Sequence, residues 1–478
     1  MAKNFYITTT LPYVNGEPHI GFAMEIVRAD AIARYKMLEG FEVFFNTGTD
    51  EHGAKLLTDA EASGKDVKSY VDEYAEKFRG LKELLNIHPD VHFIRTTDSH
   101  HEKAAQEFWK RCDKNGYIYK KNYESKYCVG CELEKTDSEL VNGYCPLHPN
   151  KQIEIRQEEN YFFKFSMFQE KLLNFYAANP EFVVPDFRFN EIKSFVQGGL
   201  QDFSISRLKS KMSWGIEVPG DPDHIMYVWF DALVNYISTL GWPENQENFE
   251  KFWINGTPVQ YCGKDNIRQQ AAMWQTMLMA ADIPNTRTIV IDGFITGEGG
   301  MKMSKSLGNA INPYDIVSEY GTDALRYFVL RELHPFEDSP FTLERFKESY
   351  NANLANGIGN LTSRIMKMAE DNLDGPVEIA PHEDMSAYHA FLDKFEFKGA
   401  MDYIWAKISE LDGIIQKTEP YKLVKTDKEK GTEIIKDLVV KLYSIRRMLT
   451  AVMPDTSAKM KEAIKANKMP SEPLFLRK

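Results

Sequence analysis

Two groups of residues in this chain have types and spacings that could do chemistry. The first is the segment GEGGMKMSKSLGN (297–309), which places lysines and serines on a glycine-rich stretch where neither packing nor helix propensity requires them. Lysines on such a loop can swing onto a polyphosphate, and the hydroxyls can add hydrogen bonds. Taken alone, such a stretch is more often a solvated surface turn, so its meaning depends on the elements around it.

The second group consists of potential metal ligands. CVGC, with Cys128 and Cys131, is separated by 13 residues from CPLH, with Cys145 and His148. Two such pairs, each beside a Gly or Pro turn, match the spacing of a tetrahedral zinc site. Four ligands leave no open coordination position, so we predict one structural Zn²⁺ per chain. The alternative is a set of unrelated buried thiols with a surface histidine.

A strand, helix and strand at the start of the chain are expected to position the phosphate-binding groups. Residues 4–11 and 41–48 are rich in β-branched and aromatic residues, and residues 19–38 carry apolar side chains at helical spacing. Two further strands are expected at 258–263 and 288–296, with a helical pattern between them. This order predicts an α/β fold with a doubly wound parallel sheet.

Ligands of an open α/β sheet bind at the carboxyl ends of its strands. The loop LPYVNGEPHIG leaves the first strand at that edge, so His19 stands at the start of a helix, where backbone N–H groups can bind an anion. A lone histidine there can equally be a helix cap or a surface residue. Its combination with KMSKS beyond the last strand favours a site for phosphate groups.

The composition describes an ordinary globular protein of two or three domains. The chain has 478 residues, is 43% hydrophobic and 27% charged, and carries a formal net charge of −12. No segment approaches the roughly 20 apolar residues of a membrane span, and the first residues lack the order of a signal peptide, so a cytoplasmic protein without a membrane partner is expected. The acidic balance argues against general coating of nucleic acid, although residues 441–478 carry nine Lys or Arg against three Asp or Glu.

Four segments that differ in composition and residue pattern suggest the domain organisation. Residues 1–115 and 226–345 are expected to form the two halves of a Rossmann-like catalytic domain. Residues 116–225, which carry the cysteine cluster and many turn signals, are expected to be an insertion. Residues 346–478 have an almost continuous helical pattern and are expected to form a separate all-α domain.

Seven segments of the chain together resemble the methionyl-tRNA synthetases, a family of class I aminoacyl-tRNA synthetases. In the family's order they are TTTLPYVNGEPHIG, TGTDEHGAK, EENYFFKFS, GGLQDFSISR, YVWFDALVNYI, GKD and KMSKSLGN. The resemblance covers nearly the whole chain. It implies activation of methionine by ATP and Mg²⁺ to methionyl-adenylate, and transfer of the methionyl group to the terminal adenosine of tRNA(Met).

The resemblance also implies roles for individual residues. His19, Lys302 and Lys305 would be catalytic, and the ATP-binding set would be His19, Gly21, Gly263, Asp265, Lys302, Ser304 and Lys305. Asp50 would hold the substrate ammonium group. The other methionine-binding residues would be Leu11, Tyr13, Trp229, Ala232, Leu233, Tyr236 and Gln270. The all-α domain would read the anticodon through Asn360, Arg364 and Tyr421.

Several of these residues have simpler alternative roles. The positions 229, 232, 233 and 236 share one face of a predicted helix, as core residues also do. Asp50 could cap a helix that begins near Glu51, and Asn360 with Arg364 could be solvated. Two positions depart from the family, because Phe22 and Gln270 stand where histidines are usual.

Three other functions would each fit part of this sequence. The isoleucine, valine and leucine enzymes of the same class would need a large editing domain, for which the insertion leaves little room. A small-molecule nucleotidyltransferase would need neither the metal cluster nor the all-α domain. A nonenzymatic tRNA-binding paralogue is favoured only by Phe22 and Gln270. No appended tRNA-binding module of the kind found in some relatives is evident, which favours a monomer.

Overall fold

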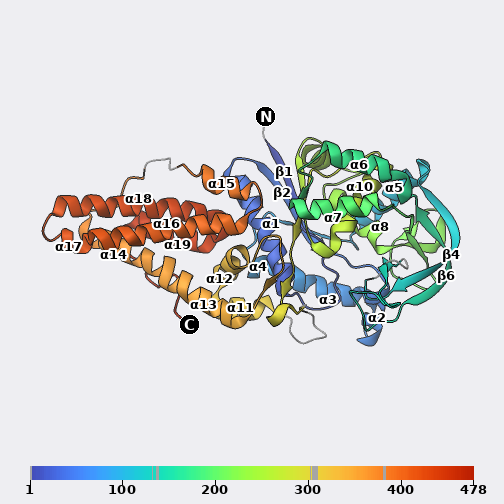
Figure 1. The fold of residues 1–478 in the computed structure, drawn as a ribbon, viewed down its shortest axis with the longest axis horizontal. Coiled ribbons are helices and arrows are strands. Elements are labelled where there is room, and N and C mark those ends of the chain that lie inside the picture. The colour runs from blue at the N-terminus through green and yellow to red at the C-terminus, as the bar shows by residue number, and fades with distance from the viewer. Residues whose placement is uncertain (1–2, 132, 136–138, 302, 304–310, 380–383) are drawn as a thin grey trace.

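The centre of the protein is a six-stranded parallel sheet. A computed structural model describes residues 3–131, 133–135, 139–301, 303, 311–379 and 384–478. In spatial order the strands are β3 (His92–Arg95), β2 (Glu42–Thr49), β1 (Asn4–Thr8), β12 (Thr257–Gly263), β13 (Thr288–Asp292) and β7 (Val183–Val184) (Figure 1). All five pairings are parallel. The predicted doubly wound sheet is confirmed, and its order reverses between β1 and β12.

Both faces of this sheet are buried, and alternate residues of each strand point to opposite cores. Ile7 and Phe45 belong to one core, together with α1 (Ile20–Leu38) and the C-terminal helices. Tyr6 and Phe44 belong to the other, together with residues of α5 (Ser99–Lys114) and α10 (Trp274–Ala280). Layers on both faces are typical of parallel sheets, whose strands lack a polar side.

Short helices complete this half of the molecule. They are α2 (Ala54–Ala62), α3 (Val67–Arg79), α4 (Leu81–Leu84), α8 (Val228–Ala232), α9 (Asn235–Ser238) and α11 (Pro313–Tyr320), with the π-helical turns η3 (Phe249–Ile254) and η5 (Gln269–Met273). Two predicted elements differ in detail. The strand expected over 288–296 is divided into β13 and β14 (Ile295–Thr296), and β14 pairs with β15 (Ser339–Pro340) in a separate sheet. The helix expected around residues 229–236 is divided into α8 and α9.

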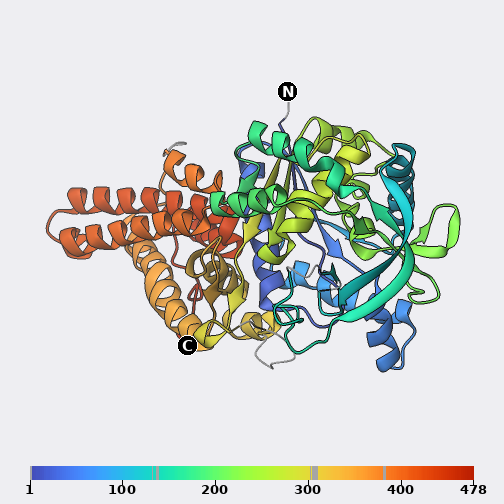
Figure 2. The same ribbon diagram turned by 45° about the vertical axis from the view of Figure 1, so that its right-hand side comes forward.

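The segment that carries the cysteine cluster forms a curved antiparallel sheet. Its long strands β4 (Ile118–Cys128) and β6 (Glu154–Phe163) bend around the end of the molecule opposite the C-terminal helices (Figure 2). The remaining elements of this region are β5 (Leu133–Glu134), η2 (Phe165–Phe168), α6 (Gln169–Ala178), α7 (Asp186–Gln197), β8 (Phe203–Ser204), β9 (Ser206–Leu208), β10 (Glu217–Val218) and β11 (Asp221–Met226). Its residues 183–184 join the central sheet as β7, beside β13.

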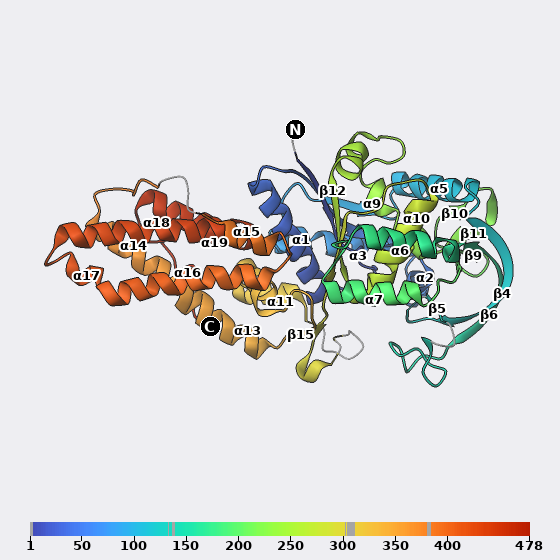
Figure 3. The same ribbon diagram turned by 45° about the horizontal axis from the view of Figure 1, so that its top comes forward.

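The C-terminal part is helical and extends away from the sheet (Figure 3). Its elements are α12 (Thr322–Tyr327), η8 (Phe328–Glu332), α13 (Leu343–Ser349), η9 (Tyr350–Gly359), α14 (Asn360–Asn372), α15 (Ser386–Leu392), α16 (Phe397–Thr418), α17 (Pro420–Leu423), α18 (Lys428–Val452) and α19 (Pro454–Ala466). The fully buried Arg326 joins this part to the sheet: it pairs with Asp30 of α1 at 2.7 Å and donates to the Val452 carbonyl of α18 at 2.9 Å. Helix α1, whose N-cap is His19, is therefore anchored against both parts.

Candidate active site

The loop after β1 forms the floor of a site at the reversal of strand order. It runs beside the end of β2, where the Asp50 N–H donates to the Pro12 carbonyl at 3.0 Å and the Val14 N–H donates to the Asp50 carbonyl at 3.2 Å. This backbone pairing holds Tyr13 and Asp50 side by side. Asp50 is not the cap of the following helix, which begins at Ala54 with Gly53 as its N-cap.

His19 caps α1. Its Nδ1 accepts a hydrogen bond from the Gly21 N–H at 3.1 Å, so the neutral ring carries its proton on Nε2 and can donate from there. A Cβ on residue 21 would lie 2.9 Å from the imidazole, which explains the glycine. Phe22 stacks on the ring with centroids 4.2 Å apart and contacts Phe78 edge-on. Phe22, which stands where the family usually has a histidine, therefore supports the imidazole through a ring contact.

A pocket of about 330 Å³ lies at this edge of the sheet. Its lining includes all eight residues predicted to bind methionine: Leu11, Tyr13, Asp50, Trp229, Ala232, Leu233, Tyr236 and Gln270. They come from the β1 loop, the end of β2, α8 with α9, and η5. Although α8 and α9 are separate, their shared face still points into the pocket. Residues that sequence reasoning missed also line it, among them Thr10, Lys55 and Asn266.

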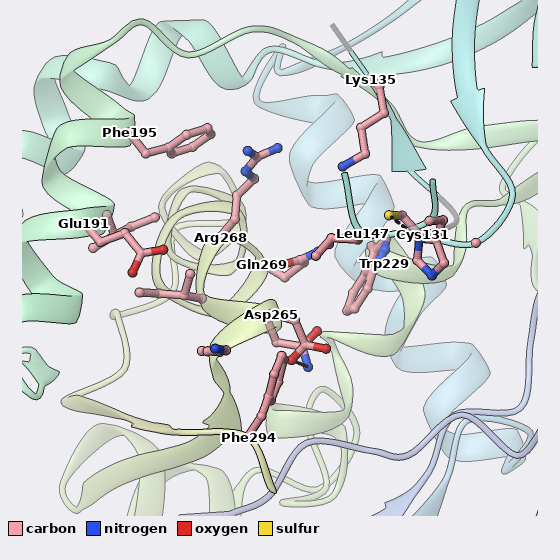
Figure 4. A pocket seen from close by; sticks show the side chains of 16 residues that line it. Cys131, Lys135, Leu147, Glu191, Phe195, Trp229, Asp265, Arg268, Gln269 and Phe294 are labelled. Atoms are coloured by element: carbon pink, nitrogen blue, oxygen red, sulfur yellow. Dashed lines mark hydrogen bonds between the residues drawn. The ribbon is translucent and has the colours of Figure 1, made fainter. Parts of the chain in front are cut away.

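A second pocket, of about 400 Å³, adjoins the first and shares Trp229, Asp265 and Cys131 with it (Figure 4). It lies between the cysteine cluster and α7. Arg268 pairs with Glu139 at 2.8 Å and lies 4.3 Å above the Phe195 ring. Lys135 and Phe294 add a cation and a further aromatic ring. Cations beside aromatic faces are suited to phosphates and unstacked bases.

The GKD segment forms the turn that follows β12. A Cβ on Gly263 would lie 2.9 Å from a carboxylate oxygen of Asp265, so glycine lets this carboxylate approach the chain. Lys264 turns away from the pair and binds Asp338 at 2.6 Å. The predicted ATP-binding residues His19, Gly21, Gly263 and Asp265 thus follow β1 and β12 at the reversal point. Lys302, Ser304 and Lys305 lie outside the described residues.

A buried network behind the first pocket was missed by sequence reasoning. Asp231, between the pocket residues Trp229 and Ala232, accepts from His52 Nδ1 at 3.0 Å and contacts His101 Nε2 at 3.4 Å. His101 also contacts the Ser238 hydroxyl at 2.9 Å. The network ties the end of β2 to the helices of the opposite wall. Its members lie far apart in the sequence, so neither TGTDEHG nor WFDAL could reveal their contact.

Within this network, Asp231 changes the titration of His52. Burial disfavours the imidazolium and lowers its pKa, but the charge of Asp231 and the hydrogen bond to it outweigh burial, and Glu102 and Glu51 add to them, so the pKa of His52 is raised. The pair therefore stabilises the fold below the ordinary histidine pKa of about 6.5, and its contribution is lost as the pH rises through the higher folded pKa.

We therefore expect Asp231→Asn to cost about 3 to 5 kcal/mol of unfolding free energy at pH 6, as when a buried pair loses one partner. Because the ion-pair contribution is lost as the pH rises through the raised pKa of His52, the cost should be smaller at pH 9 than at pH 6. Urea denaturation at both pH values measures it, and Asp374→Asn, at an exposed position, serves as the control. An equal cost at both pH values would contradict an ion pair at this position.

The predicted metal ligands come together in space. Cys128 Sγ, Cys131 Sγ, Cys145 Sγ and His148 Nδ1 all lie within 4.8 Å of one another. Ligand bonds of about 2.3 Å to sulfur in a tetrahedron require such separations, so the donor set fits zinc. A Cβ on Gly130 would lie 2.4 Å from the His148 ring, so the glycine makes room for this ligand. Gly130 and Cys131 also line both pockets.

Removing one ligand should remove the metal. We expect the natural protein to contain one zinc per chain and Cys131→Ser to contain close to none, because three ligands hold the ion far less well than four. Cys112→Ser is the matched control, since Cys112 is a buried free thiol outside the cluster. Zinc content after dialysis against a mild chelator measures the effect, and full zinc in Cys131→Ser would contradict this ligand set.

The three predicted anticodon residues lie on the C-terminal helices. Asn360 and Arg364 are exposed on α14, and Arg364 is held by Asp412 of α16 at 2.5 Å. Tyr421, in the short helix α17 at the far tip of the helical part, is 46% exposed. The exposure of all three side chains leaves them accessible to a large partner.

Comparisons with known proteins agree with one another. The family model described as tRNA synthetases class I (M) matches residues 5–153 and 139–366. The methionine–tRNA ligase of Thermotoga maritima is 39% identical, over 98% of this chain and 76% of its own length. That of Rickettsia bellii is 40% identical, over 98% of this chain and 94% of its own length.

Solved structures give the same result. Mycobacterium tuberculosis methionyl-tRNA synthetase bound by methionyl-adenylate is 35% identical, with a TM-score of 0.90, and the alignment covers 99% of this chain and 100% of that one. The free-state structure of that enzyme has a TM-score of 0.82 over 100% of this chain and 99% of its own. Among the described residues, no helix is long and apolar enough to cross a membrane.

Proposed function

Because this chain belongs to the methionyl-tRNA synthetase family of class I tRNA synthetases, we propose that its two neighbouring pockets carry the steps of methionine–tRNA ligation. The chain is a methionine–tRNA ligase that acts through methionyl-adenylate and uses ATP, methionine and tRNA(Met). The observation that carries the proposal is the convergence of eight predicted residues, from four segments, on one pocket at the reversal of strand order.

In the first pocket, Asp50 binds the ammonium group of methionine through a charge-assisted hydrogen bond. Trp229, Leu233 and Tyr236 surround the side chain, because a thioether is apolar and polarizable and packs well against aromatic and aliphatic walls. These contacts leave the carboxylate free to attack the α-phosphorus of ATP. The bond from that phosphorus to the bridging oxygen of the pyrophosphate then breaks, so methionyl-adenylate forms and pyrophosphate departs.

The nucleotide lies over the ends of β1 and β12. His19 donates from Nε2 to a phosphate oxygen, the Gly21 N–H belongs to the same helix start, and Gly263 with Asp265 faces the nucleoside. Lys302, Ser304 and Lys305 stabilise the departing pyrophosphate, and a bound Mg²⁺ would supply further positive charge for the phosphate groups. Catalysis then comes from positioning and from charge stabilisation, with no covalent enzyme intermediate.

The second pocket receives the single-stranded 3′ end of tRNA. Its cations Lys135 and Arg268 suit phosphates, and Trp229 and Phe195 offer faces on which bases can stack. Since it shares Trp229 and Asp265 with the first pocket, the terminal adenosine reaches the adenylate directly. In this proposal residues 116–225 form the insertion that guides the acceptor end, and residues 346–478 form the domain that reads the anticodon. The monomeric state and the cytoplasmic location stay predictions.

The direct test is ATP–pyrophosphate exchange with the purified protein, run with each of the twenty amino acids separately and without tRNA. Exchange with methionine alone would support the assignment of the first pocket. Exchange with another amino acid would mean that Gln270 has redirected its specificity. No exchange with any amino acid would overturn the proposed site.

Anticodon reading gives a separate prediction. Arg364→Gln should lower kcat/KM for charging of tRNA(Met) by about 5- to 150-fold, since one base contact contributes about 1 to 3 kcal/mol. Pyrophosphate exchange without tRNA should stay unchanged. Arg447→Gln, another arginine of the helical part, is the control. A loss of exchange activity in Arg364→Gln would contradict a role confined to tRNA.

A further inference from the structure

A chain of buried side-chain hydrogen bonds ends at the hydroxyl of Tyr236, in the wall of the first pocket. It begins at Thr286, two residues before the start of β13, and passes through three glutamines. All of its members are at most 2% exposed: Thr286, Gln275, Gln260, Gln270 and Tyr236. Because these side chains are buried, the donors and acceptors between Thr286 and Gln270 are satisfied by one another.

A backbone N–H group sets the donor-to-acceptor direction where this series of hydrogen bonds begins. The Thr286 N–H can only donate, and it donates to Gln275 Oε1 at 3.1 Å. This contact orients the Gln275 amide, so its Nε2 must face the other way and donate. It donates to the Gln270 carbonyl at 2.9 Å and to the Thr286 hydroxyl oxygen at 3.2 Å. The Thr286 hydroxyl is thereby an acceptor on one side and has its proton available on the other.

From there each bond fixes the next. The Thr286 hydroxyl donates to Gln260 Oε1 at 2.6 Å. Gln260 must therefore present its Nε2 to Gln270, and it donates to Gln270 Oε1 at 3.3 Å. Gln270 in turn presents its Nε2 to Tyr236 and donates to the hydroxyl oxygen at 2.5 Å. The tyrosine oxygen is then an acceptor, and its own proton has to point elsewhere.

The proton of the Tyr236 hydroxyl can point into the pocket. Among the residues that the structure describes, Gln270 is the one hydrogen-bond partner of the Tyr236 hydroxyl, and both side chains line the pocket. The end of the pocket that receives a ligand side chain therefore offers a hydroxyl donor. A thioether sulfur is a weak acceptor, whereas the methylene that replaces it in norleucine accepts nothing.

We propose that Thr286 and Gln260, which do not line the pocket, are positioning residues that set the donor direction of the Tyr236 hydroxyl and so the preference for methionine over norleucine. The inference rests on the proposed binding of methionine in this pocket. It also assigns a role to Gln270, whose amide accepts from Gln260 on one side and donates to Tyr236 on the other.

The test uses two buried threonines. Thr286→Val keeps the shape and the backbone N–H but removes the hydroxyl that links Gln275 to Gln260. Thr276→Val is the matched control, because Thr276 is equally buried and its hydroxyl donates only to the Met273 carbonyl of its own helical segment, at 2.8 Å. Thr286→Ser restores the hydroxyl and should restore the natural behaviour.

The measurement is kcat/KM in pyrophosphate exchange with methionine and with norleucine. Thr286→Val should lower the ratio of methionine to norleucine by roughly threefold to tenfold, the effect of one hydrogen bond, through a higher KM for methionine. Thr276→Val and Thr286→Ser should keep the natural ratio. An unchanged ratio in Thr286→Val, or an equal fall in Thr276→Val, would overturn the inference. Absence of methionine-dependent exchange in the natural protein would instead overturn the proposed function.

Discussion

Replacing Asp50 with asparagine should lower kcat/KM for methionine in pyrophosphate exchange by about 100- to 1,000-fold. Asp50 is 7% exposed, and its backbone is held on both sides by the loop after β1. The substitution therefore keeps the geometry and removes the charge. Truncating one partner of a buried charge pair costs about 2 to 5 kcal/mol, or roughly 30- to 5,000-fold, and the expected loss lies in the middle of that span. The loss should fall mainly on KM, because the ammonium contact is already made in the bound ground state.

A ligand without the ammonium group provides the control. Inhibition by 4-(methylthio)butanoate, which keeps the thioether and the carboxylate, should be the same for Asp50→Asn and for the natural protein. Asp374→Asn, at an exposed position of the helical part, should change neither quantity. If Asp50→Asn weakened the ammonium-free ligand as strongly as methionine, Asp50 would be supporting the pocket and not binding the ammonium group.

Lys305→Ala should slow methionyl-adenylate formation by about 100- to 1,000-fold, the cost of removing one group that stabilises charge in the transition state. Methionine binding should barely change, because the lysine acts on the phosphates. The prediction rests on the KMSKS sequence, whose lysines lie outside the described residues. Single-turnover adenylate formation and equilibrium dialysis with labelled methionine measure the two quantities separately.

Lys398→Ala is the control for the loss of a lysine, because Lys398 lies on α16 and pairs with Asp402 at 2.7 Å. It should leave both quantities unchanged. Comparable losses of adenylate formation and of methionine binding in Lys305→Ala would contradict a role confined to the phosphates. A drop in the affinity for ATP without a drop in rate would assign Lys305 to ground-state binding.

The substitutions of Asp50 and of Thr286 test two different contacts of the same pocket. In the proposed function, Asp50 binds the ammonium group, whereas Thr286 acts on the contact to the ligand side chain through Gln260, Gln270 and Tyr236. If both predictions hold, the pocket binds the ammonium group through a charged contact and the side chain through a weaker, neutral hydrogen bond. The charged contact would dominate affinity, and the neutral hydrogen bond would sort side chains of nearly equal shape.

The sequence by itself determined the features that depend on residues close together along the chain. The order of strand, helix and strand, and hence the doubly wound sheet, follows from short-range periodicity of apolar residues. The metal ligands fall in one short segment, so their spacing alone implied the cluster that Cys128, Cys131, Cys145 and His148 form. His19 was placed at a helix start by the turn before it, and it caps that helix.

Only the tertiary structure decided which distant residues meet. Asp231 and His52 are 179 positions apart, and the bond from Thr286 to Gln260 joins a loop to the strand beside it. Residues 183–184 join the central sheet, and the strand expected over 288–296 is split between two sheets. Such contacts carry no local signature, because a buried polar group can be satisfied by any suitable partner that the packing brings near. The backbone path, and not the residue type, selects that partner.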